Sequence, residues 1–268
     1  MSAAAYIELS GVKKTWNAQG RLTTALAGID LMIEKGAFVS IVGPSGCGKS
    51  TLLQIMAGLV PASDGMVRLH GQPVREPPRD MIYVFQQYTR SLFPWKNVQR
   101  NVAYGLESRG GLSAADIAER TAQTIAKVKL QGFENHYPWQ LSGGMQQRVA
   151  IARALACAPD VLLMDEPFSS VDALTRVGLQ QLLLDLWQSL GLTVIFVTHD
   201  VDEAIYLSTR VVALSRPPAH VGLDLTIALD HPRDAILTRE HVHYLDYRHR
   251  LLAQLFADEG IASGAVHS

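Results

Sequence analysis

Short, almost continuously hydrophobic runs alternate with helix-forming stretches along most of this chain. The runs are rich in β-branched residues, which is typical of strands buried on both faces of a parallel sheet. Strands that alternate with helices predict an α/β fold with a largely parallel sheet. The expected strands are AFVSIVG (37–43), MIYVF (81–85), VLLMDE (161–166), LTVIFVT (192–198) and RVVALS (210–215), and the expected helices are STLLQIMAG (50–58), AADIAERTAQTIAKV (114–128), GMQQRVAIARALA (144–156), ALTRVGLQQLLLDLWQSL (173–190) and VDEAIYLS (201–208).

Two regions before residue 161 depart from this alternation. The first forty residues, with YIELSGVKKTW and IDLMIEKG, favour short antiparallel strands and turns. From about residue 88 to 160 no strand is apparent, and prolines and glycines separate helical pieces. We therefore expect a small antiparallel β region and a helical subdomain inserted at about 88–160.

The end of the chain has a different character again. Residues 216–235 suggest one or two extra strands, and residues 238–256 have the pattern of an amphipathic helix. We expect a main domain over residues 1–215, which contains the insertion, and a C-terminal extension over residues 216–268. The apolar face expected for the helix includes Val242, Leu245, Leu252, Leu255 and Phe256.

Composition and charge narrow the class of protein. With 268 residues, 48% of them hydrophobic, the chain can bury a sizeable core. A formal net charge of -1 gives no argument for nucleic-acid binding, and two cysteines form neither a metal-type spacing nor a disulfide framework. The N-terminus has no signal-peptide pattern, and the hydrophobic runs are far shorter than the ~20 residues that cross a bilayer. We expect work at a membrane to require docking onto another protein.

The segment GPSGCGKST matches the phosphate-binding pattern G-x-x-x-x-G-K-[ST] between a predicted strand and a predicted helix. Glycines let successive N–H groups point at phosphate oxygens, and the helix start adds its positive dipole end. Lys49 is expected to reach the β- and γ-phosphates, and the Ser50 hydroxyl to help hold Mg²⁺. The alternative is a glycine-rich turn that matches by chance. The candidate nucleotide-binding residues here are Gly43, Pro44, Ser45, Gly46, Cys47, Gly48, Lys49, Ser50 and Thr51.

A second chemical element follows the strand VLLM, whose end carries Asp165 and Glu166. We expect Asp165 to bind Mg²⁺, and Glu166 to act as a general base or to orient the attacking water. The alternative is an ordinary acidic strand end.

The segment LSGGMQQR has the character of a second anion-binding helix start. Ser142 can cap the helix, and Gly143 and Gly144 let the backbone approach a ligand closely. The alternative is a helix cap without a ligand.

Taken in order, GPSGCGKST, a glutamine after a strand, LSGGMQQR, VLLMDEP, SSVD and THD resemble the ATP-binding subunit of ABC transporters over nearly the whole chain to about residue 215. The resemblance implies a P-loop NTPase (RecA-like) core, with GPSGCGKST as the P-loop and LSGGMQQR as the signature segment. It also implies a homodimer with a two-fold axis, in which ATP is buried between the P-loop of one copy and the signature segment of its partner. It implies that Ser142, Gly143 and Gly144 contact the γ-phosphate of an ATP held by the partner.

The resemblance also assigns roles to single residues. Gln86 matches the glutamine that senses Mg²⁺ and the γ-phosphate, although its neighbour Gln87 is one residue away. Asp172, in SSVD, matches an aspartate that works across the dimer seam, and His199 is expected to touch the γ-phosphate. Trp16 lies where this family places an aromatic that stacks on adenine, the alternative being a core tryptophan.

Cys47 lies beside Lys49 and a helix start, both of which could lower its pKa. We expect an accessible thiol that ATP protects from alkylation.

A partner surface is expected at the start of the insertion, where Phe93, Pro94 and Trp95 form an apolar group. In ABC transporters this region receives the cytoplasmic coupling helix of the membrane permease; packing within the insertion is the alternative. The chain resembles the ATP-binding subunits of importers for nitrate, sulfonates and taurine. This resemblance implies a solute-binding protein as an indirect partner, and it implies that the chain lies on the cytoplasmic face of the cell membrane. A non-transport ABC ATPase, an importer of another small solute and a P-loop small-molecule kinase remain as alternatives, although a kinase leaves LSGGMQQR and THD unexplained.

Overall fold

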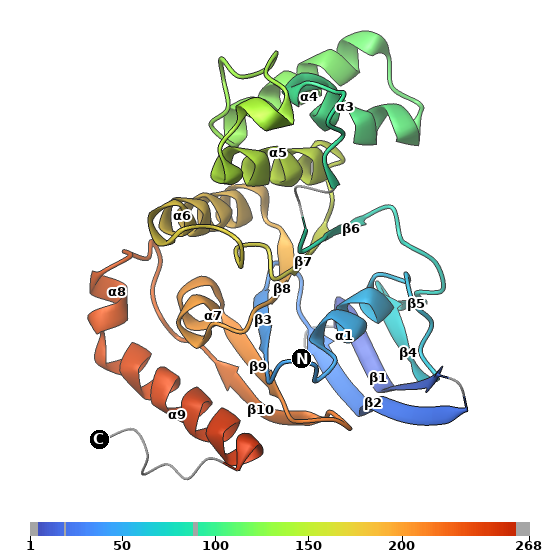
Figure 1. Ribbon diagram of the computed structural model, residues 1–268, viewed down its shortest axis with the longest axis vertical. Helices are drawn as coiled ribbons and strands as arrows, with labels where there is room; N and C mark the ends of the chain where they lie inside the picture. The colour runs from blue at the N-terminus through green and yellow to red at the C-terminus, as the bar shows by residue number, and fades with distance from the viewer. Residues whose placement is uncertain (1–4, 19, 88–90, 261–268) are drawn as a thin grey trace. The chain divides into compact units, whose positions relative to one another are not determined.

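The computed structural model of the chain describes residues 5–18, 20–87 and 91–260. Two compact units divide it (Figure 1): Met1–Pro78 together with Thr193–Ser268, and Arg79–Leu192. Both units combine strands with helices, so the predicted α/β fold is confirmed. The start of the expected insertion, at 88–90, lies outside the described residues, and the functional boundaries at 88–160 and 215 stay a prediction.

The first unit contains an antiparallel sheet in the order β2-β1-β4-β5. Antiparallel strands were expected in the first forty residues, but β1 and β2 are long rather than short. Gly65 of β4 packs so closely on β1 that an added Cβ would lie 2.2 Å from the Gly11 carbonyl oxygen. The strands are β1 (Ile7–Ala18), β2 (Arg21–Ile33), β4 (Asp64–Leu69) and β5 (Gln72–Pro73), of which the last two were not among the expected strands.

The same unit contains a mixed group of strands in the order β10-β9-β3-β8. β3 pairs in parallel with β8 and β9, and β10 is antiparallel to β9. All residues of β3 and β8 are buried, which explains their unbroken hydrophobic character. The bounds are β3 (Phe38–Val42), β8 (Thr193–Val197), β9 (Arg210–Leu214) and β10 (Val221–Thr226), and the helices of this unit are α1 (Lys49–Met56), α7 (Val201–Leu207), α8 (Leu237–Glu240) and α9 (Val242–Glu259).

The second unit contains one parallel strand pair and a group of helices. Within its described residues before Asp160, no strand follows β6, as expected for the inserted region. Gly110 ends α3 at φ 66, and Pro138 opens a 3₁₀ turn, so the punctuating residues act where the sequence indicated. The elements are β6 (Met81–Val84), α3 (Val98–Arg109), α4 (Ala114–Lys127), the 3₁₀ turn η1 (Pro138–Gln140), α5 (Gly143–Ala156), β7 (Val161–Asp165) and α6 (Ala173–Leu190).

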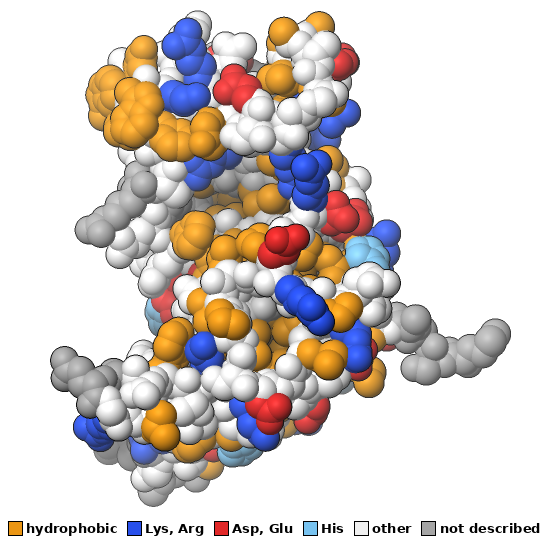
Figure 2. Space-filling view, turned by 90° about the vertical axis from the view of Figure 1, so that its right-hand side faces the viewer, with side chains coloured by type: hydrophobic (Ala, Val, Ile, Leu, Met, Phe, Trp, Pro, Cys, Tyr) orange, Lys and Arg blue, Asp and Glu red, His pale blue; other side chains and the backbone are white. Residues whose placement is uncertain are grey.

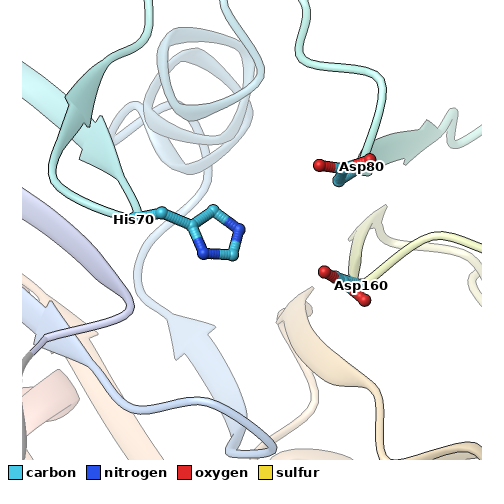
Figure 3. A group of neighbouring side chains, drawn as sticks. All are labelled: His70, Asp80 and Asp160. Atoms are coloured by element: carbon cyan, nitrogen blue, oxygen red, sulfur yellow. The ribbon is translucent and has the colours of Figure 1, made fainter.

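Two aspartates precede the parallel strands of the second unit (Figure 3). The backbone N–H groups of Asp160 and Val161 both donate to the Asp80 carbonyl oxygen at 2.9 Å, which aligns the amino ends of β6 and β7. Figure 3 also draws His70 of the first unit, which lies between β4 and β5 at φ 51, with its ring edge-on to Tyr6.

The C-terminal helix is present, but its expected buried face is only partly correct: Leu252, Leu255 and Phe256 are half-buried. Val242 and Leu245 are exposed, whereas Tyr244 and Leu251 are fully buried. The helix packs on α7, β9 and β10, and Tyr244 reaches a polar partner on α7. A periodicity counted from aliphatic residues alone therefore misses the centre of the buried face of α9.

Over the described ranges 5–18, 20–87 and 91–260, no helix has the length and hydropathy that crossing a membrane would require. Hydrophobic side chains do gather on the surface of the helical part of the second unit, at the upper left of Figure 2. Exposed large residues of that part include Trp95, Tyr104 and Trp139.

Candidate nucleotide-binding site

The loop after β3 has the backbone of a phosphate cradle. Gly43, Gly46 and Gly48 have positive φ angles of 156, 76 and 106, a conformation that side chains with a Cβ rarely adopt. At Gly43 space is also lacking, since an added Cβ would lie 2.8 Å from the Leu214 carbonyl oxygen. The glycines at these positions are therefore required by conformation, and at Gly43 by packing as well.

Lys49, the first residue of α1, is turned back into this loop. Its ammonium group donates to the carbonyl oxygens of Gly43, at 2.8 Å, and Pro44, at 3.0 Å, and the residue is only 5% exposed. Ser50 is exposed at the same helix start, and Thr51 is half-buried. The loop thus presents a held cation and an exposed hydroxyl at a helix N-terminus, where an anion is stabilised.

The expectation of an accessible, low-pKa Cys47 is wrong. Its side chain is buried, and burial raises the pKa of the thiol in spite of the nearby Lys49 ammonium. The Sγ atom would lie 2.9 Å from a Cβ added at Gly43, so the thiol fills the inside of the loop.

His199 follows the strand next to the one that leads into the loop. β3 and β8 are parallel, with Ile41 opposite Val197, and the Thr198 N–H donates to the Ile41 carbonyl oxygen at 3.2 Å. His199 is exposed directly after this contact. The loop and His199 therefore both extend from carboxyl ends of adjacent parallel strands, where α/β proteins place their ligands.

Trp16 lies on β1 and is 43% exposed, which argues against the alternative of a core tryptophan. The Lys14 ammonium lies 4.3 Å from its ring centroid and donates to the Pro61 carbonyl oxygen. A partly exposed indole ring of this kind can stack on a planar ligand.

In the second unit, β6 and β7 bring Gln86, Asp165 and Glu166 to one edge. The Gln86 amide donates to Glu166 Oε2 at 3.2 Å. Glu166 has φ 43, a left-handed conformation that is uncommon for a residue with a side chain and is found preferentially at functional sites.

Asp165 is only 6% exposed, and it has a partner that sequence reasoning missed. The Tyr83 hydroxyl donates to Asp165 Oδ2 at 2.8 Å. The register sets Tyr83 opposite Leu163, so Asp165 is two residues further along on the same face. Only the alternation of strand MIYVF hinted at this contact, since register is invisible in the sequence.

The signature segment begins α5. Ser142 is the N-cap, with its hydroxyl accepting from the Met145 N–H at 3.3 Å. Ser142 and Gly143 are exposed, whereas Gly144 is buried. An added Cβ at Gly144 would lie 2.2 Å from Thr175 Cγ2 of α6, so this glycine has a packing role within the chain.

Asp172 is the N-cap of α6. Its carboxylate accepts from the Thr175 N–H at 3.0 Å, and this bonding holds the pKa of Asp172 below its ordinary value. The residue is exposed, so a cap and a contact with another molecule are compatible.

A profile of the ABC transporter family matches residues 26–169, which include the loop, the signature segment and Glu166. The chain belongs to the ABC transporter family. An uncharacterized ABC transporter ATP-binding protein of Methanocaldococcus jannaschii is 46% identical over 257 residues, which cover 96% of this chain and 93% of that protein.

Two further relatives of this ABC protein have names that state a cargo. An aliphatic sulfonates import ATP-binding protein of Bacillus cereus is 44% identical and aligns over 85% of this chain and 88% of its own length. A taurine import ATP-binding protein of Shigella boydii is 47% identical over 74% and 76% of the two chains.

Among solved structures, the ATP-binding cassette MJ0796, in a dimeric post-hydrolysis state bound to ADP and Pi, matches with a TM-score of 0.73 and 35% identity. The alignment covers 84% of this chain and all of MJ0796. The expected P-loop NTPase fold is thereby confirmed.

The ABC protein also has a pocket of about 210 Å³ in its second unit, between β6, α3 and α5. Tyr83, Phe85 and Tyr104 are among its lining residues, with Arg153 and Cys157. Phe93 packs beside it on Tyr104, at 4.6 Å between ring centroids, whereas Trp95 is 69% exposed. Packing within the helical part of the second unit thus accounts for the apolar side chain of Phe93, whereas Trp95 stays largely exposed.

The predicted residues divide between the two units. The first unit holds the P-loop, Trp16 and His199, and the second holds Gln86, the two acidic residues, the signature segment and Asp172. Sequence reasoning missed Tyr83 and Thr175, which support Asp165 and Gly144.

Proposed function

We propose that this chain binds and hydrolyses ATP as one half of a two-site dimer and thereby powers an ABC importer. The observation that carries the proposal is the glycine loop after β3 with Lys49 held inside it, in a chain of the ABC transporter family. In the proposed complex, phosphate oxygens replace the Gly43 and Pro44 carbonyl oxygens as partners of the Lys49 ammonium.

In the proposed reaction, Lys49 moves to the β- and γ-phosphates while loop N–H groups hold the remaining oxygens. Trp16 stacks on the adenine, as its exposed ring permits. Glu166 orients the attacking water or accepts its proton, and the Gln86 amide at 3.2 Å fixes the direction of the Glu166 carboxylate.

The chemistry of the assigned metal ligands fits Mg²⁺. Ser50 offers a hydroxyl, Asp165 a carboxylate and Gln86 an amide oxygen, the hard donors that this ion takes. When bound, Mg²⁺ would supply positive charge that offsets the negative charge of the phosphates. The Tyr83 hydroxyl holds one carboxylate oxygen of Asp165 and so orients this side chain.

The second half of each site comes from the partner copy. Ser142 and Gly143 are exposed at the start of a helix of 14 residues, and a helix N-terminus stabilises a γ-phosphate. The buried Gly144 contributes by letting α5 approach α6. We assign His199 to the γ-phosphate in its own chain and Asp172 to the dimer seam.

The chain is proposed to lie on the cytoplasmic face of the cell membrane and to power import through a separate integral membrane permease. The permease's coupling helix is proposed to dock near Phe93–Trp95, where the exposed Trp95 and the pocket beside Tyr104 offer apolar area. ATP-driven closure of the dimer would draw two such helices together. The cargo is a small oxyanion or sulfonate, such as nitrate, taurine or an alkanesulfonate, delivered by a solute-binding protein. The names of the sulfonate and taurine relatives support this class.

Sizing chromatography of the Glu166→Gln variant with Mg-ATP tests the proposal. The variant keeps an amide oxygen for the Gln86 contact, removes the charge needed for water activation and should move to the dimer position with ATP but not with ADP. Lys49→Ala in the same background is the matched control and should stay monomeric. A Glu166→Gln variant that remains a monomer at saturating Mg-ATP would favour a kinase. Failure to co-purify with a permease from membranes would favour an ABC ATPase that works elsewhere.

A further inference from the structure

The C-terminal extension holds the short helix that follows His199. α7 has seven residues and is buried at every position except Asp202, which is half-buried. α9 packs against it from the C-terminal extension, and the contacting residues Asp202 and Tyr244 are 42 residues apart in the chain. The first and last turns of α7 each receive specific polar contacts from the extension.

The first turn of α7 is held by two residues of α9. The Tyr244 hydroxyl donates to the Asp202 carbonyl oxygen at 2.9 Å and to Asp202 Oδ1 at 3.1 Å, and Tyr244 is 1% exposed. Arg248 Nε lies 3.1 Å from the same Oδ1. Burial raises the pKa of Tyr244 far above its ordinary value, so the hydroxyl remains a donor at any physiological pH.

The last turn of α7 is held by Arg233. Its guanidinium donates to the carbonyl oxygens of Ile205, at 3.0 Å, and Tyr206, at 2.7 Å, and the Tyr206 hydroxyl donates back to the Arg233 carbonyl oxygen. Carbonyls at a helix end need donors, and a cation there also matches the helix dipole. Both ends of α7 are therefore fixed by residues beyond 230.

The helix that these contacts hold, α7, in turn fixes Thr198 and Asp200, the residues on either side of His199. The Thr198 hydroxyl donates to the Glu203 carboxylate at 2.7 Å in a buried contact. The Asp200 N–H donates to Thr198 Oγ1, and the Glu203 N–H donates to Asp200 Oδ1, each at 3.1 Å. His199 therefore lies between Thr198 and Asp200, which both hydrogen-bond to Glu203. Glu203 is adjacent to Asp202, the residue that Tyr244 contacts.

We propose that Tyr244 is a positioning residue for His199, and that the C-terminal extension sets the place of the imidazole relative to the P-loop through Asp202 and Glu203. The inference rests on the proposed function, in which His199 acts on the γ-phosphate. It gives the extension a role in hydrolysis rather than in nucleotide binding.

The test compares Tyr244→Phe with Tyr247→Phe on the same helix. The Tyr247 hydroxyl accepts from the Ala228 N–H at 3.2 Å and is the matched control. Tyr244→Phe should lower kcat by about 2- to 30-fold, with KM for ATP unchanged, because coupling through packed elements has that size. It should also shift the NMR resonances of the His199 ring, whereas Tyr247→Phe should change neither kcat nor this signal.

A background variant separates positioning from general damage. In His199→Ala, the further change Tyr244→Phe should have no effect on the residual single-turnover rate. An equal loss in both backgrounds, an unchanged kcat in the single variant or an unmoved His199 resonance would overturn the inference. Asp202→Asn, which keeps the helix and removes the charge that Arg248 meets, is the second variant should Tyr244→Phe not fold. Wild-type protein without ATPase activity would instead defeat the proposed function.

Discussion

Replacing Gly144 with alanine tests whether the signature segment is fixed by packing as well as by its ligand. The added Cβ would lie 2.2 Å from Thr175 Cγ2, more than 1 Å inside the 3.4–4 Å of ordinary contact. Thr175 is β-branched and lies in the first turn of α6, so it has little freedom to turn away. One of the two helices must therefore shift.

The size of the effect follows from two opposing contributions. Overpacking of this kind costs about 1–3 kcal/mol, and alanine in place of glycine in a helix returns up to about 1 kcal/mol. We expect Gly144→Ala to lower the free energy of unfolding by about 1–2 kcal/mol. Gly178→Ala in α6 is the matched control: its Cβ would meet only Arg148 at 3.9 Å, so this change should raise stability.

Adding Thr175→Ser to Gly144→Ala decides whether the Cγ2 methyl causes the loss of stability, because serine lacks this methyl. The remaining Thr175 atoms near the added Cβ are 3.7 and 3.9 Å away, so the double variant should recover most of the stability lost in Gly144→Ala. Equilibrium urea unfolding, read from the midpoints, measures the wild type, the three single variants and the double variant. A Gly144→Ala variant as stable as the wild type, or a double variant less stable than Gly144→Ala, would refute the packing argument.

Three further predictions concern single side chains. Cys47 should resist alkylation in the folded protein with or without ATP, because it is buried; fast labelling of Cys47 measured by mass spectrometry would contradict this. Tyr83→Phe should lower the free energy of unfolding by about 1–3 kcal/mol by removing the donor to a buried carboxylate, and unchanged urea midpoints would count against it. His231 has its pKa lowered to about 4, mainly by burial, so the unfolded chain binds the proton first and stability should fall as the pH drops from about 6.5 towards 4. A His231→Gln variant with the same loss of melting temperature over that range would show that another group is responsible.

Elements whose boundaries depend on local chemistry could be predicted from the sequence. α6 spans 173–190 as expected, because Asp172 caps its start and Gly191, at φ 63, ends it. The buried strands β3, β7 and β8 were expected to within a residue or so at each end, since parallel strands buried on both faces leave long hydrophobic runs.

Features that depend on contacts distant in the chain could not be predicted in the same way. The buried side of α9 is set by Tyr244, whose partner Asp202 is 42 residues earlier. Cys47 looked exposed in a glycine-rich loop, but Gly43 packs on Leu214 and closes the loop around the thiol. In the same way the support of Asp165 by Tyr83 depends on strand register, which spacing along the chain does not reveal.

Complementation between two inactive variants tests most directly whether each catalytic site needs both copies. Lys49→Ala disables the P-loop half of a site, and Ser142→Arg blocks the signature half, so each variant alone should have no ATPase activity. In an equal mixture, half of the dimers pair one variant with the other, and each such dimer has one intact site, so activity should return to about a quarter of the wild-type value. A mixture that stays as inactive as its components, under conditions where wild-type dimers form, would contradict the account.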